Sequence, residues 1–111
     1  MIIFMASDCN PTYSGVDDIL ELLTKSKSLH ILMVMERKNK PIRFSDLKKL
    51  VDSSSTTISR RLKELEAQGL VARTLIDGVE NLTEYSITKD TKSLSPILQS
   101  LYDWVDERNK N

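Results

Sequence analysis

The sequence predicts a mainly α-helical α+β domain that carries one two-stranded β-hairpin. Three observations lead to this prediction. Apolar residues recur along much of the chain with the 3.6-residue period of amphipathic helices. A short helical pattern is joined to a longer one by the polar turn 52–55. Two strand-like runs then flank the turn signal Asp77-Gly78.

Two helices are expected in the first third of the chain. The first opens at Gly15 and has the apolar residues Val16, Ile19, Leu20 and Leu23. The second is capped by Ser26 or Ser28, and it ends at residues 39–41 because Pro41 cannot continue a helix. Its apolar residues are Leu29, Ile31, Leu32, Met33 and Met35.

The next two helices are a short and a long one. After an extended stub at Ile42-Arg43, the short helix has the apolar residues Phe44, Leu47, Leu50 and Val51. The long helix runs from about residue 56 to residue 68, and Gly69 follows it in the position that favours a left-handed residue.

A hairpin and a last helix complete the chain. Strands are expected at 70–76 and 83–87, with a loop at 77–82. The last helix spans about residues 92–108, with Pro96 near its start or at a kink. Short helix, tight turn, longer helix and hairpin form the order of a winged helix-turn-helix.

Length and composition favour one intracellular domain. The 111 residues fit a single unit, in which we expect a flexible N-terminal arm at 1–14 and the winged-helix domain at 15–111. No apolar run approaches the length of a membrane span. The single cysteine, Cys9, cannot form an intrachain disulfide, which indicates a reducing compartment and predicts a cytoplasmic protein.

Charge is unevenly distributed although the net charge is zero. Between Glu36 and Thr74 the sequence has ten basic and five acidic residues, so this segment carries +5 and the remainder −5. A basic centre with acidic flanks can hold a polyanion on one face. The plainer interpretation is that solvated helices carry charge in any case.

Five segments together are similar to a known family. They read PIRFSDL at 41–47, ISRRLKEL at 58–65, GLV at 69–71, EYSIT at 84–88 and LSPIL at 94–98. In this order they resemble the HxlR-type family of bacterial and archaeal transcriptional regulators, over roughly residues 26–106. The resemblance implies a winged-helix protein that binds DNA and whose terminal helices form a dimer interface.

The helix at 56–68 is the expected recognition helix. Ile58, Leu62 and Leu65 share one face and point inward, so Arg60 and Lys63 point outward. Arg60 is expected to contact a base, because a guanidinium can pair bidentately with guanine, and Arg61 to reach a phosphate. The residues of this helix expected at DNA are Ser55, Thr56, Thr57, Ser59, Arg60, Arg61 and Lys63. The alternative is a solvated helix whose hydroxyls only cap it.

Further contacts are expected on both sides of this helix. The resemblance implies that Arg43, Ser45 and Lys48 contact the DNA backbone. The tip of the hairpin is acidic and would be repelled by phosphate. Either this wing stays off the DNA, or Arg73 and Asn81 make its contacts.

The last helix carries an apolar stripe that must be buried. The stripe packs either on its own domain or, as the resemblance implies, on a second copy that binds the other half of a pseudo-palindromic operator in double-stranded DNA. The residues expected in this homodimer interface are Val16, Leu20, Leu94, Ile97, Leu98, Leu101, Trp104 and Val105.

Chemistry beyond binding finds little support in the sequence. Cys9 is either a redox-responsive thiol or an incidental one. His30 is the only histidine, so no metal site, catalytic triad or cofactor is expected and the chain is predicted not to be an enzyme.

Zero net charge and the acidic wing keep a second function open, a winged-helix module that binds another protein. Binding of RNA or single strands is disfavoured, because the recognition helix has no aromatic residue to stack on bases. No effector can be identified.

Overall fold

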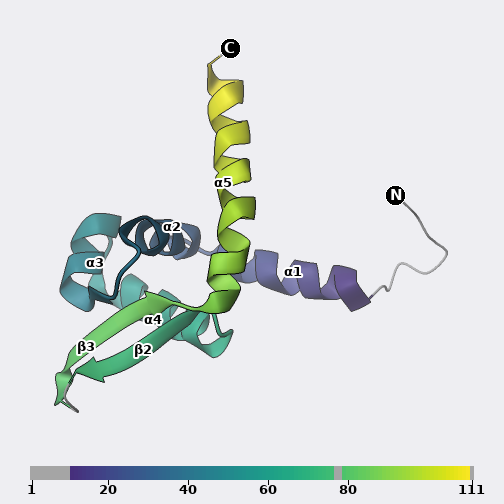
Figure 1. The fold of residues 1–111 in the computed structure, drawn as a ribbon. Helices are drawn as coiled ribbons and strands as arrows, with labels where there is room; N and C mark the ends of the chain where they lie inside the picture. The colour runs from purple at the N-terminus through teal and green to yellow at the C-terminus, as the bar shows by residue number, and fades with distance from the viewer. Residues whose placement is uncertain (1–10, 77–78, 111) are drawn as a thin grey trace.

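A computed structural model describes residues 11–76 and 79–110, and it confirms the mainly helical winged-helix fold (Figure 1). The elements in chain order are α1 (Pro11–Leu23), α2 (Ser28–Lys38), β1 (Ile42–Arg43), α3 (Phe44–Val51), α4 (Ser55–Ala67), β2 (Val71–Ile76), β3 (Val79–Ile87) and α5 (Lys89–Asn109). No helix among the described residues is long and apolar enough to cross a membrane.

The sheet has three antiparallel strands in the order β1-β3-β2. The expected stub Ile42-Arg43 pairs with β3, so it adds a third strand to the predicted hairpin. Strand β3 begins at Val79, and part of the expected loop 77–82 is therefore strand. The register of β2 against β3 shifts between Leu75 and Ile76, as at a β-bulge.

One hydrophobic core lies where α2, α3 and α4 meet the base of the sheet. Every element except α5 and β3 contributes a buried apolar side chain to it, and α5 and β3 pack against it through half-buried ones. Its members are Leu22, Leu23, Ile31, Leu32, Met35, Ile42, Leu47, Val51, Ile58, Leu62, Leu65, Leu70 and Val71. Leu50 is not among them. It is 43% exposed, although the sequence pattern placed it on the apolar face of this helix.

Two helix starts differ from expectation. Helix α1 begins at Pro11 instead of Gly15, which accords with the preference of proline for the first turn of a helix. Residues 11–14 of the expected arm are thus helical, and residues 1–10 lie outside the described part. Helix α2 is capped by neither Ser26 nor Ser28. Its N-cap is Lys27, a left-handed residue with φ of 73° and no capping side chain.

Helix α4 matches the predicted recognition helix to within one residue at each end. The Ser54 Oγ accepts a hydrogen bond from the Thr57 backbone N–H, which satisfies one of the free donors of its first turn. At the other end Gly69 has a φ of 76°, the left-handed conformation that the sequence predicts there.

The base of α5 is tied to the junction of α4 and β2. Thr88 caps α5, and its hydroxyl donates to the carbonyl of Gly69 at 2.6 Å. The hydroxyl of Thr91, which is fully buried, donates to the carbonyl of Leu70. From this anchored base α5 continues through Pro96 to Asn109.

Helices α1 and α5 project from the body in different directions (Figure 1). The radius of gyration is 16.2 Å, whereas a compact domain of this length has one of about 13 Å. The two projecting helices account for this elongation, because α2, α3, α4 and the sheet pack around the core.

Candidate nucleic-acid interface

An open hollow of about 570 Å³ lies between the start of α3 and the outer face of α4. Its lining residues are Phe44, Ser55, Thr56, Ser59, Arg60 and Lys63. All except Phe44 belong to the set that the sequence predicts at DNA. The structure therefore brings the expected contacts of the recognition helix together on one surface.

The packing of α4 explains why these side chains face outward. Ile58, Leu62 and Leu65 are fully buried or nearly so, and they hold one face of the helix against the core. Arg60 and Lys63 lie on the opposite face and are exposed. No ion pair within residues 11–76 and 79–110 engages either of them. Their charges remain available to an anionic ligand.

The hollow combines three kinds of group that suit DNA. Small hydroxyls at Ser55, Thr56 and Ser59 permit a close approach to bases or phosphates. The backbone N–H groups of the first turn of α4, together with the helix dipole, favour an anion. Arg60 offers a planar guanidinium that matches the major-groove edge of guanine.

Two residues of the predicted set do not join this surface. Arg61 points the other way: its Nε donates to the Ser26 carbonyl at 3.0 Å, and its guanidinium pairs with Glu64. Only 12% of its side chain is exposed, so Arg61 would have to leave these partners to reach a phosphate, and that contact stays a prediction. Thr57 is half-buried and takes part in the Ser54 cap through both its N–H and its hydroxyl.

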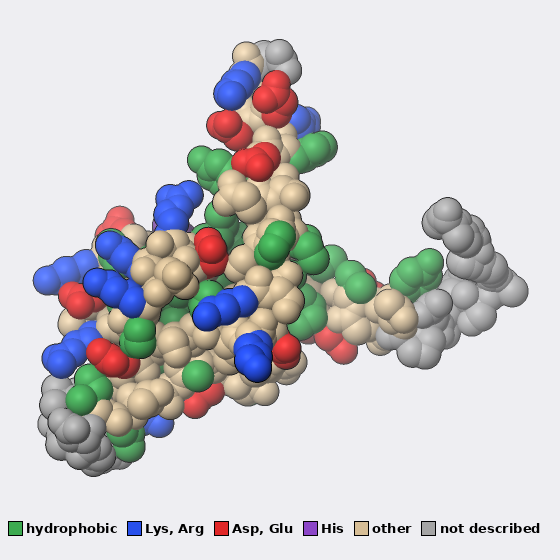
Figure 2. Space-filling view, in the orientation of Figure 1, with side chains coloured by type: hydrophobic (Ala, Val, Ile, Leu, Met, Phe, Trp, Pro, Cys, Tyr) green, Lys and Arg blue, Asp and Glu red, His purple; other side chains and the backbone are tan. Residues whose placement is uncertain are grey.

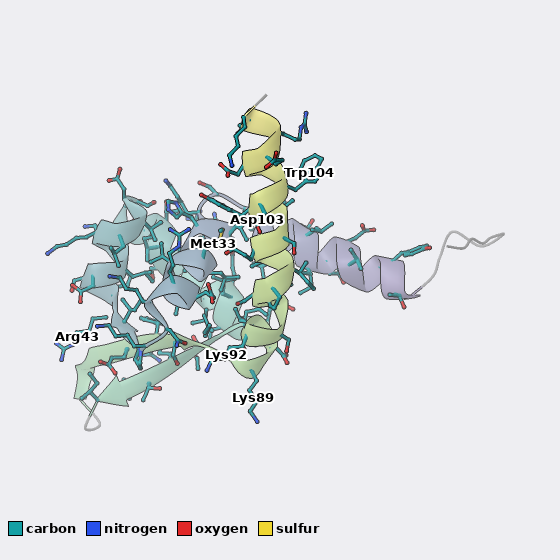
Figure 3. The ribbon with its side chains drawn as sticks, turned by 45° about the horizontal axis from the view of Figure 1, so that its top comes forward. Met33, Arg43, Lys89, Lys92, Asp103 and Trp104 are labelled. Carbon is teal, nitrogen blue, oxygen red and sulfur yellow. The ribbon has the colours of Figure 1, made fainter. Side chains whose placement is uncertain are left out.

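The start of α3 lies beside the hollow. Ser45 and Lys48 are exposed on this helix, where phosphate contacts were expected. Arg43 is the N-cap of α3 and lines a separate hollow of about 560 Å³. Figure 3 shows Arg43 pointing away from the body of the molecule. Three further cations line this second hollow, namely Lys38, Lys40 and Lys49. The sequence pattern did not single them out as DNA contacts.

The wing is described only in part. Arg73 is exposed on β2, where it stands opposite Tyr85 of β3. The side chain of Asn81 and the turn at 77–78 lie outside the described residues. The predicted wing contacts therefore stay predictions.

The apolar stripe of α5 remains largely uncovered. The exposed fractions of Ile97, Leu101 and Trp104 are 64%, 50% and 58%, and Val105 is 43% exposed. Figure 2 shows hydrophobic side chains along α5 and α1, and Figure 3 shows Trp104 projecting from the part of α5 that has left the body. Leu94 and Leu98 are half-buried at the base.

Helix α1 presents a similar surface. Val16 and Leu20, which were predicted at an interface, are 50% and 49% exposed. Tyr13 on α1 and Tyr102 on α5 extend the apolar surface and were missed by the sequence analysis. Their spacing could have found them, since Tyr13 precedes Val16 by three residues and Tyr102 follows Leu98 by four.

The described residues provide little basis for metal binding or catalysis. His30 is exposed on α2, and no group of three or more potential metal-ligating side chains occurs within the described ranges. Cys9 lies outside them, so its role stays open.

Comparisons with known proteins place the chain among helix-turn-helix regulators. The HxlR-like helix-turn-helix family matches it over residues 23–111. The uncharacterized HTH-type transcriptional regulator YvaP of Bacillus subtilis is 36% identical over 102 residues, which cover 91% of this chain and 90% of YvaP.

Two solved structures agree with this result. One is described as a possible HxlR family transcriptional factor from Thermoplasma volcanium. It has a TM-score of 0.71 and 28% identity, and the match covers 84% of this chain and 83% of that one. The other is the redox regulator HypR in its reduced form, with a TM-score of 0.72, 26% identity and coverage of 86% and 93%.

Proposed function

Because the chain belongs to the HxlR-like helix-turn-helix family of transcriptional regulators, we propose that it binds a specific double-stranded DNA sequence as a homodimer. The family consists of DNA-binding regulators rather than enzymes. The hollow on α4 is the observation that carries the proposal. It gathers three hydroxyls and two cations, which no ion pair among the described residues engages, on an exposed helix face.

In the proposed complex α4 enters the major groove with its N-terminal half toward the base edges. Arg60 reads a guanine, and Ser55, Thr56 and Ser59 approach the neighbouring bases or the phosphates. Lys63 neutralises a phosphate, as do Lys48 on α3 and Arg43 at its N-cap. The Ser45 hydroxyl donates a hydrogen bond to a phosphate. These contacts position the helix, whereas Arg60 supplies sequence preference.

The apolar surfaces of α1 and α5 support the homodimer. Side chains as large as Trp104 and Ile97 are more than half exposed in the single chain, and contiguous exposed apolar surface of this kind marks an interaction site. A second copy would cover them through a two-fold contact. The two recognition helices would then face half-sites about one helical turn, roughly 34–36 Å, apart on a pseudo-palindrome.

A regulator of this kind acts on the chromosome, so the proposal places the protein in the cytoplasm. A response to oxidants is a separate hypothesis. HypR is named a redox regulator, and a corresponding role here would require Cys9. Diamide treatment tests that role, because an unchanged subunit size and an unchanged affinity for DNA would exclude it.

The experiment that tests the function is a fluorescence-anisotropy titration. The purified protein is titrated against DNA from upstream of its own gene and against a scrambled duplex, each at two salt concentrations. We expect tight binding that prefers the native sequence and weakens steeply with salt, because phosphate contacts release counterions. Absence of binding to both duplexes at micromolar protein would contradict the proposal and favour a module that binds another protein.

A further inference from the structure

A cluster of polar groups joins the recognition helix to the turn that follows α1. The Glu64 carboxylate accepts from two cations, the guanidinium of Arg61 on its own helix and Lys25 Nζ at 3.3 Å. Arg61 in turn donates from Nε to the Ser26 carbonyl at 3.0 Å. We call these four groups, on Lys25, Ser26, Arg61 and Glu64, the α1–α4 clamp.

The turn that the clamp engages is itself closed by hydrogen bonds. Thr24 N–H and Oγ1 both donate to the Leu20 carbonyl, at 2.9 and 2.7 Å, which closes the end of α1. Lys25 N–H donates to Leu22, and Ser28 N–H donates back to Lys25. Because the turn is hydrogen-bonded on both sides, its position relative to α4 determines the direction in which α1 leaves the body.

Few buried apolar side chains of α1 fix that direction. Of the described side chains of α1, only Leu22 and Leu23 at its C-terminal end are buried. These two leucines and the half-buried Ile19, one turn earlier, hold the C-terminal half of α1 against the core, and the N-terminal half extends beyond it. An open hollow of about 400 Å³ separates the neighbouring part of α1 from α4, and Lys25 and Glu64 lie on its lining. The clamp is therefore a polar link across this hollow, from the turn after α1 to α4.

A small change at the clamp produces a large change at the far end of α1. The helix has 13 residues, so it is about 20 Å long at 1.5 Å per residue. A rotation of about 10° about its base moves the far end by about 3.5 Å, which is roughly the rise of one base pair. A small change in the angle between α1 and α4 is therefore enough to shift one half-site relative to the other by about one base pair.

We propose that Glu64 is a positioning residue which, through Arg61 and Lys25, sets the angle between the recognition helix and the α1 arm. In a dimer held by α1 and α5, this angle adjusts the half-site spacing that the dimer accepts. This inference rests on the proposed homodimer and on its binding to DNA. Glu64 does not line the hollow that Arg60 and Lys63 line. It lies on the flank of α4, where it lines the hollow beside α1 and pairs with Arg61 and Lys25.

The test uses the full chain with Glu64→Gln, which keeps the side-chain shape and removes the charge. A second variant, Lys25→Met, breaks the clamp without changing α4. The matched control is Glu66→Gln, since Glu66 is exposed on the same helix and no ion pair within the described residues engages it. Each protein is titrated against duplexes whose two half-sites are moved apart one base pair at a time.

We expect the wild type and Glu66→Gln to share one preferred spacing. In both clamp variants the preference for that spacing over its neighbours should fall by about threefold to fivefold, the size of effect of a partly exposed ion pair. Thermal unfolding and sedimentation should show that the variants remain folded dimers. A spacing preference in Glu64→Gln equal to that of the wild type would overturn the proposal.

A measurement without DNA separates this inference from the proposed function. Spin labels at Ser14→Cys and Lys63→Cys, in a Cys9→Ser background and diluted with unlabelled chain, report the distance between α1 and α4 within one chain. We expect Glu64→Gln to shift or broaden that distance and Glu66→Gln to leave it unchanged. An unchanged distance in Glu64→Gln refutes the clamp even if the wild type binds DNA as a dimer. Failure of the wild type to dimerise or to bind DNA refutes the proposed function instead.

Discussion

At the scale of single residues, Arg60 differs from the other cations of α4 in what it can recognise. Its guanidinium is exposed in the hollow and has no ionic partner among the described residues. We predict that Arg60→Ala weakens binding to the cognate duplex by about 1–3 kcal/mol and reduces the preference over a scrambled duplex. Anisotropy titrations of the two duplexes measure both effects.

Lys63 provides the matched comparison, because it lines the same hollow one turn further along α4. An ammonium contacts phosphate as a point charge, so Lys63→Ala should weaken binding to both duplexes equally and lower the salt dependence. If Arg60→Ala leaves the affinity unchanged, the proposed orientation of α4 in the groove is wrong.

Glu64 should contribute to stability in a pH-dependent way. The guanidinium of Arg61, and then Lys25, hold the pKa of its carboxyl below the ordinary value of 4.5, against the opposing effect of burial. A carboxyl whose pKa is lower in the folded chain stabilises the fold above pH 4.5, and that contribution is lost as the pH falls through the folded value. Asp18 and Glu21 of α1 line the same hollow as Glu64.

We therefore predict that Glu64→Gln is less stable than the wild type near neutral pH and that this difference shrinks as the pH falls below about 4.5. Urea midpoints measured at several pH values test it. Glu66→Gln removes a carboxyl that no ion pair among the described residues engages, so it should follow the wild type throughout. A difference between Glu64→Gln and the wild type that is constant with pH would show that the Glu64 charge does not stabilise the folded chain.

At the scale of elements, one buried hydroxyl acts beside that of Thr88 in attaching α5 to the body. Thr91 is 0% exposed, and its Oγ1 donates to the carbonyl of Leu70, the residue directly before β2. Thr91→Val keeps the volume and removes the donor. We predict a loss of about 1–2 kcal/mol in the free energy of unfolding, because a buried hydrogen bond is lost and a hydroxyl site becomes apolar. Urea denaturation measures this loss.

Ser93→Ala is the control for Thr91→Val. Ser93 lies on the same helix, is exposed, and donates only to the Lys89 carbonyl one turn earlier. Its replacement should change the stability by no more than about 0.5 kcal/mol. Equal effects of the two substitutions would mean that the Thr91 hydrogen bond does not hold α5 to the body.

At the scale of the whole molecule, the elongated chain leaves an uncovered apolar stripe on α5. We predict that Ile97→Lys dissociates the proposed homodimer and lowers its affinity for a two-half-site duplex. The chain should remain folded, because Ile97 is 64% exposed and packs little on its own domain. A charge in the centre of an apolar interface is costly. Sedimentation and circular dichroism measure the two properties.

Gln99→Lys introduces the same charge on the opposite face of α5, where Gln99 donates to Asp103 at 3.0 Å. This variant should remain a dimer. If Ile97→Lys stays dimeric as well, the stripe of α5 is not the dimer interface.

The sequence by itself determined the order of the elements and the outward face of α4. Both follow from local rules: apolar residues repeat with the helical period, and a helix with Ile58, Leu62 and Leu65 on one side must present Arg60 and Lys63 on the other. The left-handed Gly69 and the polar turn before α4 are equally local. Five of the six residues that line the hollow could be named for the same reason.

Only the tertiary structure decided which basic and apolar residues are free to act. Arg61 is the same residue type as Arg60 and follows it directly in the sequence. Its guanidinium, however, donates to the Ser26 carbonyl, which is 35 positions away. Leu50 fits an apolar helical pattern yet stays exposed, and the stub β1 is too short for its pairing with β3 to be predicted. Pairing and burial depend on the packing of segments distant in sequence, and periodicity within one segment contains no information about that packing.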